Sequence, residues 1–282
     1  MKDKLFKAVL FAAACFIILL TAGIVYGLVT RSWDTFTHTG FFNFITSTEW
    51  DSRNDVYGAL PFIAGTLMTA VLAILFCIPF SLSVSLFTGE YFRNKKLSTF
   101  VSSVVDLLAG VPSIVFGLWG FYTLRPLLVD AGLNQQGFGV LLASVILAIM
   151  IIPYASSLSA EFIAMVPNDL KEGAYSLGAT RLEVIQQVNL PVAGSGIFAS
   201  YILAFGRALG ETMAVTMLIG NTNNIPQGLG DTGNTMASII ANQFGEAGGL
   251  KLSSLMAIGL LLFLITASVN FIAKYIMKLV NK

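Results

Sequence analysis

Charged side chains are scarce in this chain of 282 residues. Asp, Glu, Lys and Arg make up 11% of it, whereas a soluble globular domain contains about a quarter. The hydrophobic fraction is 56% and the mean hydropathy is +0.80, which excludes intrinsic disorder, because disordered chains combine low hydrophobicity with high net charge. A net charge of +1 gives no basic surface for nucleic acid. The composition therefore predicts a protein whose solvent is the lipid bilayer.

Cysteine and histidine are nearly absent. The two cysteines, Cys15 and Cys77, lie in long apolar runs, where a thiol behaves as a small hydrophobic side chain. The single histidine is His38, so a zinc site and a Ser-His-Asp triad lack their usual parts. No Walker A sequence, G-x-x-x-x-G-K-[ST], occurs. We therefore expect this chain to have no enzyme activity, metal or cofactor of its own, and any ATP to be bound by another subunit.

Long apolar runs are abundant. A membrane helix needs about 20 mostly apolar residues to cross a hydrocarbon core of about 30 Å. We therefore predict an all-α membrane protein with six transmembrane helices. The first run follows a basic start, but its length favours a retained helix over a cleaved signal peptide. The predicted helices cover residues 5–29, 57–88, 97–128, 138–165, 192–220 and 252–277.

The distribution of positive charge predicts the orientation of these helices. With the N-terminus inside, eleven of the sixteen Lys and Arg residues lie in inner segments and four in outer segments, while Arg207 falls within a helix. Positive residues accumulate on the cytoplasmic side of membrane proteins. Both termini are therefore predicted to be cytoplasmic, in a multi-pass protein of the plasma (inner) membrane.

Two of the connecting segments have unusual compositions. The outer segment 31–56 carries six Trp and Phe residues, which predicts that part of it lies along the outer membrane surface at headgroup level. The inner segment 166–191 is polar, yet apolar residues recur in it at helical spacing, and Asn168 or Asp169 can cap a helix there. An ordered helix in this connection needs a partner or a packing reason.

Arg207 is the most informative residue, because it lies near the middle of the predicted fifth helix. An arginine at the bilayer centre costs about 2.5–3.5 kcal/mol on insertion scales, so it should face protein or water. Glu211 follows four residues later, on the same face of a continuous helix. The pair is either an anion path, in which Glu211 holds the guanidinium until phosphate or carboxylate competes for it, or a structural ion pair. Spacing alone favours neither.

Asp106 is a third ionisable candidate, in the predicted third helix. Pro112 follows it and removes a backbone donor, so the helix should kink or break there. A broken membrane helix is tolerated only where protein or water satisfies the freed carbonyls. Asp106 is therefore a candidate for the substrate path or a gate, with an interfacial residue bonded to a neighbouring loop as the alternative.

The inner segment resembles the EAA loop of ABC-transporter permeases. In that family E-A-A is followed by three residues, a glycine, nine residues and I-x-L-P; here the middle alanine is Gly173 and the isoleucine is Val188. The resemblance implies a coupling helix that docks on the ATPase subunit. It assigns this role to the matching positions Glu172, Gly173, Ala174, Gly178, Leu190 and Pro191.

Three further segments, 61–67, 108–118 and 206–215, resemble permeases of the phosphate-specific transport (PstC-type) family. The resemblance covers the chain from about residue 57 onward. It implies the type I ABC permease fold of binding-protein-dependent importers in residues 57–282, with the coupling loop at about 166–191. Residues 1–56 would then form a peripheral transmembrane helix and an aromatic extracytoplasmic loop.

The same resemblance implies a function and a set of partners. The chain would be the permease subunit of a prokaryotic ATP-driven importer that carries inorganic phosphate inward by alternating access, with Arg207 and Glu211 in the anion path. It would assemble with a PstA-like second permease, two copies of an ATP-binding subunit that uses ATP-Mg, and an extracytoplasmic phosphate-binding protein, within membrane lipid. The alternatives are a permease for another oxyanion, such as molybdate, sulfate or phosphonate, and a stand-alone channel or secondary carrier.

A cysteine placed at Asn224, in the predicted outer segment 221–250, tests this topology. We expect a membrane-impermeant thiol reagent to label Asn224→Cys on intact cells, because the segment faces outward. Labelling that appears only after the cells are lysed would overturn the predicted orientation.

Overall fold

Long helices dominate the computed structural model, which describes residues 2–132 and 136–280. Five helical segments within it are long and apolar enough to cross a membrane. Each apolar run supplies its own backbone hydrogen bonds as a helix, which hydrocarbon requires. These segments are built on α1 (Lys2–Thr39), α3 (Leu60–Leu86), α7 (Val140–Ala164), α10 (Leu190–Leu209) and α13 (Gly249–Val280).

The predicted third helix is broken in two. Helix α4 (Lys96–Ala109) and the segment Ser113–Asp130 meet at an angle of 93°. Pro112 stands at the break, as expected for a residue that lacks a backbone donor. The second segment comprises α5 (Ser113–Trp119), the π-helical turn η2 (Gly120–Leu124) and α6 (Arg125–Asp130). Counted as one span, this bent pair brings the number of spans to six, as the sequence predicts.

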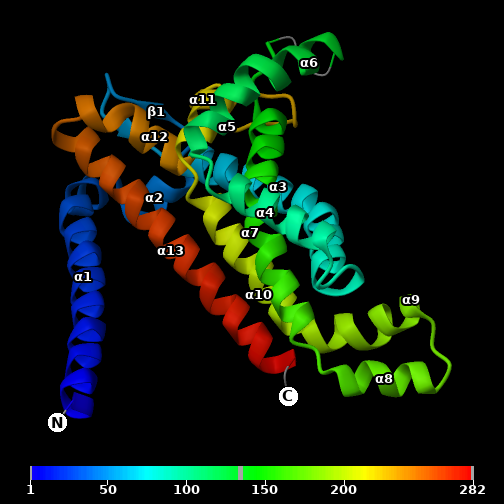
Figure 1. Cartoon of the computed structure of the whole chain (residues 1–282). Helices are drawn as coiled ribbons and strands as arrows, with labels where there is room; N and C mark the ends of the chain where they lie inside the picture. The colour runs from blue at the N-terminus through cyan, green and yellow to red at the C-terminus, as the bar shows by residue number, and fades with distance from the viewer. Residues whose placement is uncertain (1, 133–135, 281–282) are drawn as a thin grey trace.

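The arrangement of the chain ends agrees with an even number of crossings. The start of α1 and the end of α13 lie at the same end of the molecule, where α8 (Asn168–Ser176) and α9 (Arg181–Val184) also lie (Figure 1). We call this the α8 end. Helix α6, strand β1 (Trp50–Asp51), helix α11 (Met213–Leu218) and helix α12 (Met236–Gln243) lie at the opposite end, the α12 end (Figure 1).

The fifth span differs from its predicted limits at both ends. A continuous helical rod runs from Arg181 to Leu209 through α9, the π-helical turn η3 (Ile185–Asn189) and α10. The span therefore begins ten residues before Pro191, which is nearly three helical turns, and stops before Gly220, the end that the apolar run suggested. Residues beyond Leu209 form the separate helix α11.

The aromatic segment 31–56 is largely ordered and only partly exposed. Helix α1 continues through it to Thr39, and α2 (Phe41–Thr46) and a two-stranded antiparallel hairpin follow, in which β1 pairs with β2 (Val56–Tyr57). Phe44 is fully buried and Trp50 is nearly so, in a cluster with Phe62 of α3 and Met236 of α12. Trp33 and Phe42 are exposed. The predicted surface position therefore suits only part of the segment, because the other aromatic rings anchor it to the protein core.

The spans differ greatly in how far the protein encloses them. The most apolar window of α7 is 67% buried, whereas that of α1 is 0% buried. Alanines such as Ala73 of α3 and Ala143 of α7 are buried in the main cluster, where small side chains let helices approach closely. Helix α7, packed between α3 and α10, is therefore the centre of the fold.

Helix α1 attaches to the rest through α13. The Thr35 hydroxyl donates to Ser253 Oγ at 2.8 Å and lies 3.1 Å from Ser254 Oγ, in a buried polar contact. The apolar side chains nearer the start of α1, such as Phe11 and Ile18, are exposed. This half of α1 therefore presents its side chains to lipid or to another subunit.

Gly65 of α3 offers a test of the packing at the α12 end. A methyl group there would collide with the backbone carbonyl of Asn234, beside the hydrogen bond from Met236 N to Thr66 Oγ1 at 2.9 Å. We expect Gly65→Ala to destabilise the purified protein by about 1–3 kcal/mol, the usual cost of overpacking. Thermal unfolding in detergent measures the change.

Gly194 of α10 supplies the matched control, because a methyl group there meets nothing within 4 Å. Gly194→Ala should leave the melting temperature unchanged or raise it slightly, since alanine favours helix more than glycine. Equal melting temperatures for the two variants would contradict the close approach at Gly65.

Candidate functional site

Arg207 lies in the last turn of α10 and its side chain is exposed. Its guanidinium carbon is 5.9 Å from the centre of the Tyr154 ring, a weak cation–π contact. Tyr154 belongs to α7 and stands ten residues before the end of that helix at Ala164. Arg207 therefore faces the interior of α7 from the last turn of its own helix, and not from near the middle of that helix as the sequence predicts.

The structure separates Arg207 from Glu211. Helix α10 ends at Leu209 with Gly210 as its C-cap, so Glu211 is not one helical turn further on. The Glu211 Oε1 atom instead accepts a hydrogen bond from Ala214 N at 3.3 Å, at the start of α11. Among the side chains that the structure describes, the only ion pair joins Lys171 to Glu90. The predicted i, i+4 ion pair between Arg207 and Glu211 is therefore wrong for this structure.

Helix ends explain the arrangement of these two charges. A cation is stabilised at the C-terminal end of a helix and an anion at the N-terminal end. Arg207 occupies the last turn of α10 and Glu211 precedes the first turn of α11, so each charge is stabilised by its own helix. The guanidinium of Arg207 consequently has no carboxylate partner in the described part of the chain, which leaves its planar fork available to an anion.

The break itself carried a signal in the sequence. Gly210 and Thr212 are residue types that commonly end one helix and begin the next, and they flank Glu211. The unbroken hydrophobicity of residues 213–220 outweighed that signal in the prediction. One neighbour of Arg207, Tyr154 of α7, was also missed, because no local pattern marks it.

Asp106 lies away from this group. Together with Glu161 of α7 it lines a cavity of about 280 Å³ between α3, α4 and α7. Neither Arg207 nor Glu211 lines that cavity. Two carboxylates repel an anion, so the geometry gives no support to Asp106 as a phosphate ligand, and its role in the substrate path stays a prediction.

The coupling segment forms a capped helical hairpin at the α8 end. Helix α8 begins after Pro167 without a side-chain cap, so neither Asn168 nor Asp169 is the N-cap. It ends in a Schellman motif, in which Gly178 N donates to Tyr175 O at 2.9 Å and Ala179 N donates to Ala174 O at 3.1 Å. Gly178 has φ +89°, a left-handed conformation that favours glycine.

A second cap starts the rod that follows. Glu183 Oε2 accepts hydrogen bonds from the Thr180 backbone N and hydroxyl at 2.7 Å each, and Glu183 N donates back to Thr180 Oγ1 at 3.4 Å. This capping box satisfies the free donors at the beginning of α9. The turn between α8 and α9 is therefore fixed on both sides.

The predicted coupling residues fall into two groups. Glu172, Gly173 and Gly178 are exposed on the hairpin, Ala174 is half-buried, and the neighbouring Leu177 is 91% exposed. Leu190 lies instead within the rod, where it packs against a buried cluster that includes Ile163. The exposed group has the apolar and polar character of a docking surface, whereas Leu190 and Pro191 belong to the span.

A metal centre is not built by the residues that the structure describes, since no three or more of their His, Cys, Asp and Glu side chains gather in one place.

Comparison with known families gives a match over most of the chain. Residues 81–282 match the family described as binding-protein-dependent transport system inner membrane component. The match begins within α3 and includes the coupling hairpin and the Arg207 region. Helix α1 lies outside it, so the division of the chain at residues 56 and 57 stays a prediction.

Individual relatives match over almost their whole length. A protein of Haemophilus influenzae named phosphate transport system permease protein PstC is 39% identical over 96% of this chain and 92% of its own length. A protein of the same name from Mesorhizobium japonicum is 39% identical over 98% of this chain and 90% of its own length.

Solved structures show the same fold at low identity. The MetNI methionine ABC transporter, in an inward facing conformation, has a chain that superposes with a TM-score of 0.63 at 17% identity, over 79% of this chain and 97% of its own. An amino acid ABC transporter gives 0.54 at 20% identity, over 77% of this chain and 92% of its own. These likenesses establish the type I ABC importer permease fold for the present chain.

Proposed function

The chain belongs to the family of binding-protein-dependent transport system inner membrane components, and we propose that it carries inorganic phosphate inward across the membrane. It is a multi-pass inner membrane permease subunit of an ABC importer, whose ATPase activity lies in a separate subunit. Phosphate is the substrate named for relatives that match 96–98% of the chain. The observation that carries the proposal is the exposed, carboxylate-free guanidinium of Arg207 inside a span.

Arg207 suits phosphate for electrostatic and geometric reasons. A guanidinium presents a planar fork of donors that pairs with two phosphate oxygens at once. The dipole of α10 partly balances its charge before the anion arrives. Glu211 lies across the break at the start of α11. Its carboxylate would repel an anion that moves past Arg207 toward α11. We assign Arg207 the role of a transient phosphate ligand. We assign Glu211 the role of a negative charge that limits how long phosphate stays bound to Arg207.

The α8 end is the cytoplasmic end in this proposal. Eleven of the sixteen Lys and Arg residues belong to segments predicted to be inside, and the start of α1 and the end of α13 lie at the same end of the molecule as α8 (Figure 1). The α12 end then faces outward and receives phosphate from an extracytoplasmic phosphate-binding protein. A PstA-like second permease completes the path, and two ATP-binding subunits, which hold ATP-Mg, dock at the α8 end.

In the proposed alternating access, ATP use at the α8 end is coupled to the position of Arg207. Closure of the ATP-binding subunits displaces the exposed hairpin surface around Glu172 and Gly178, and the rod Arg181–Leu209 carries this displacement toward Arg207. The hairpin must interact differently with the ATP-binding subunits in the two states, because a ligand shifts an equilibrium only through its differential affinity.

Replacement of Arg207 tests the anion path. We expect Arg207→Met to reduce uptake of radiolabelled phosphate at least about tenfold in cells that express all the subunits, because a charge-assisted contact is worth about 1.5–3 kcal/mol. Arg53→Met is the matched control, since Arg53 is exposed in the loop between the two strands. Normal uptake by Arg207→Met, at normal abundance in the membrane, would make Arg207 structural.

Competition in the same assay identifies the anion. Excess sulfate, molybdate or phosphonate should leave phosphate uptake by the native complex unchanged. Displacement of phosphate by one of them would assign the permease to that oxyanion. Uptake by this chain without the ATP-binding subunits would instead favour a stand-alone carrier.

Gly178 tests the docking surface. We expect Gly178→Asp to leave the chain folded but to lower co-purification of the ATP-binding subunit about tenfold, because a side chain at φ +89° costs about 1–2 kcal/mol and reshapes the exposed turn. Gly173→Ala is the matched control, since a methyl group there meets nothing within 4 Å. Co-purification that is undiminished by Gly178→Asp would place the docking surface elsewhere.

A further inference from the structure

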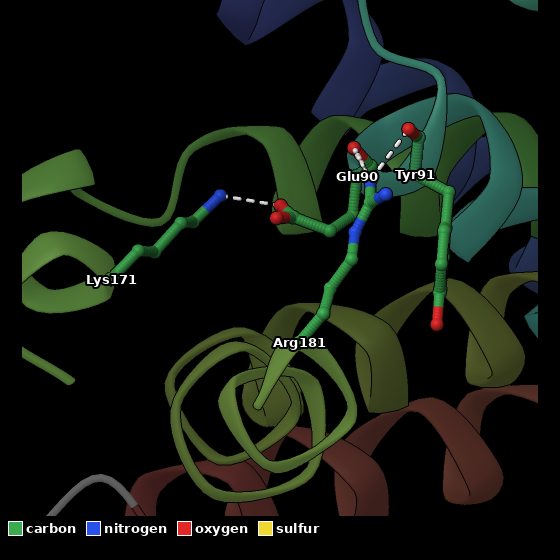
Figure 2. Close-up of polar contacts among 4 residues, drawn as sticks. All are labelled: Glu90, Tyr91, Lys171 and Arg181. Carbon is green, nitrogen blue, oxygen red and sulfur yellow. Dashed lines mark hydrogen bonds and ion pairs between the residues drawn. The ribbon is translucent and has the colours of Figure 1, made fainter. Parts of the chain in front are cut away.

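Four residues at the α8 end form a contact that the proposed function does not yet use. Figure 2 shows Lys171 of α8 and Arg181 of α9 both reaching the end of the second span, where Glu90 and Tyr91 lie. Glu90 and Tyr91 end the π-helical turn η1 (Phe87–Tyr91), which continues α3. We call Glu90, Tyr91, Lys171 and Arg181 the clamp.

The clamp combines a buried ion pair with a second, backbone-directed cation. Lys171 Nζ lies 2.5 Å from Glu90 Oε2, and the two side chains are only 9% and 10% exposed. Arg181 Nη2 donates to Tyr91 O at 2.6 Å and to Glu90 O at 3.5 Å, while its guanidinium lies 4.1 Å from the centre of the Tyr91 ring. Two cations from opposite sides of the Gly178 turn therefore hold the same two residues.

Helix physics explains why the end of the second span attracts them. The last carbonyls of a helix lack partners within that helix, and the helix end carries partial negative charge. Arg181 satisfies two of these carbonyls, and Lys171 neutralises the carboxylate of Glu90 in the same turn. Because the ion pair is buried, its two side chains cannot separate without leaving an unpaired charge out of water, which would be costly. The burial therefore fixes the geometry of the pair.

The chain connection alone gives α8 a link to only two spans. Helix α7 leads into α8 from one side, and the rod Arg181–Leu209 leaves it on the other. The clamp adds the second span, α3 with η1, although Glu90 and Lys171 are 81 residues apart in sequence. Gly89 reinforces this junction, because a methyl group there would lie 2.7 Å from Ala160 O of α7.

We propose that Glu90, Lys171 and Arg181 are positioning residues that transmit the displacement of α8 to the second span, so that the second, fourth and fifth spans move together when ATP is used. The proposal rests on the proposed function, because it assumes that closure of the ATP-binding subunits displaces α8. It predicts that loss of the clamp uncouples ATP hydrolysis from phosphate movement without loosening the docked subunit.

Two double variants of the full transporter in proteoliposomes test the clamp. Glu90→Leu with Lys171→Met removes both charges together, and such apolar replacements of buried pairs commonly keep the protein folded. We expect this variant to retain ATP hydrolysis and co-purification but to move about tenfold less phosphate per ATP, a typical size for coupling between sites. Glu90→Lys with Lys171→Glu restores an ion pair in reverse and should recover most of the native ratio.

The control variant and the results that would contradict the proposal are both read from the ratio of phosphate moved to ATP hydrolysed. Lys95→Met removes an exposed cation near the same span end, over the Phe92 ring, and should leave the ratio unchanged. A native ratio in the apolar double variant would overturn the proposal, as would a reversed pair that transports no better than the apolar pair. A native complex that hydrolyses ATP without moving phosphate would overturn the proposed function. This result is seen in the native complex alone, whereas the clamp proposal is tested by differences between the variants and the native complex.

Discussion

Hydrocarbon offers backbone N–H and C=O groups no partner, so each of them inside the bilayer must be satisfied by the protein itself. This constraint makes every apolar run a helix, and it turns each helix break into a site that needs explanation. The chain has such breaks at residues 110–112 and 210–212. At the second, the ends of α10 and α11 offer partial charges of opposite sign, and the chain places Arg207 and Glu211 there. The scarce charges of the spans thus mark where helices stop.

The same rule governs the α8 end, where water is near but the contacts are buried. The carbonyls at the end of η1 are satisfied by Arg181, and the free donors of α9 are satisfied by the Thr180 capping box. Gly178 lets the turn between the two helices close with a Schellman motif. With its backbone groups satisfied on both sides, we expect the hairpin to move as one body and not to absorb a displacement by fraying.

The spans were largely predictable because hydropathy reports what lipid demands, and the break at Pro112 was predictable because proline lacks a donor. The break at Gly210 was not, since the apolar residues that follow it continue the hydrophobic run into α11. Composition also misplaced Phe44 and Trp50, because an aromatic ring that suits the headgroup layer suits a core equally well. The clamp lay beyond sequence reasoning altogether, as the ion pair between Glu90 and Lys171 depends on tertiary proximity that no local pattern encodes.

One helix connects the two regions of proposed function. The rod begins at Arg181, which holds the end of the second span, and ends two residues after Arg207. At 1.5 Å per residue its length is about 40 Å, enough to reach from one membrane surface deep into the bilayer. A rigid rod held at one end converts a small rotation there into a larger sideways displacement at the other. In the proposed mechanism the clamp end and the Arg207 end therefore move together, and a small movement of α8 carries the guanidinium toward or away from Tyr154 and the break beside Glu211.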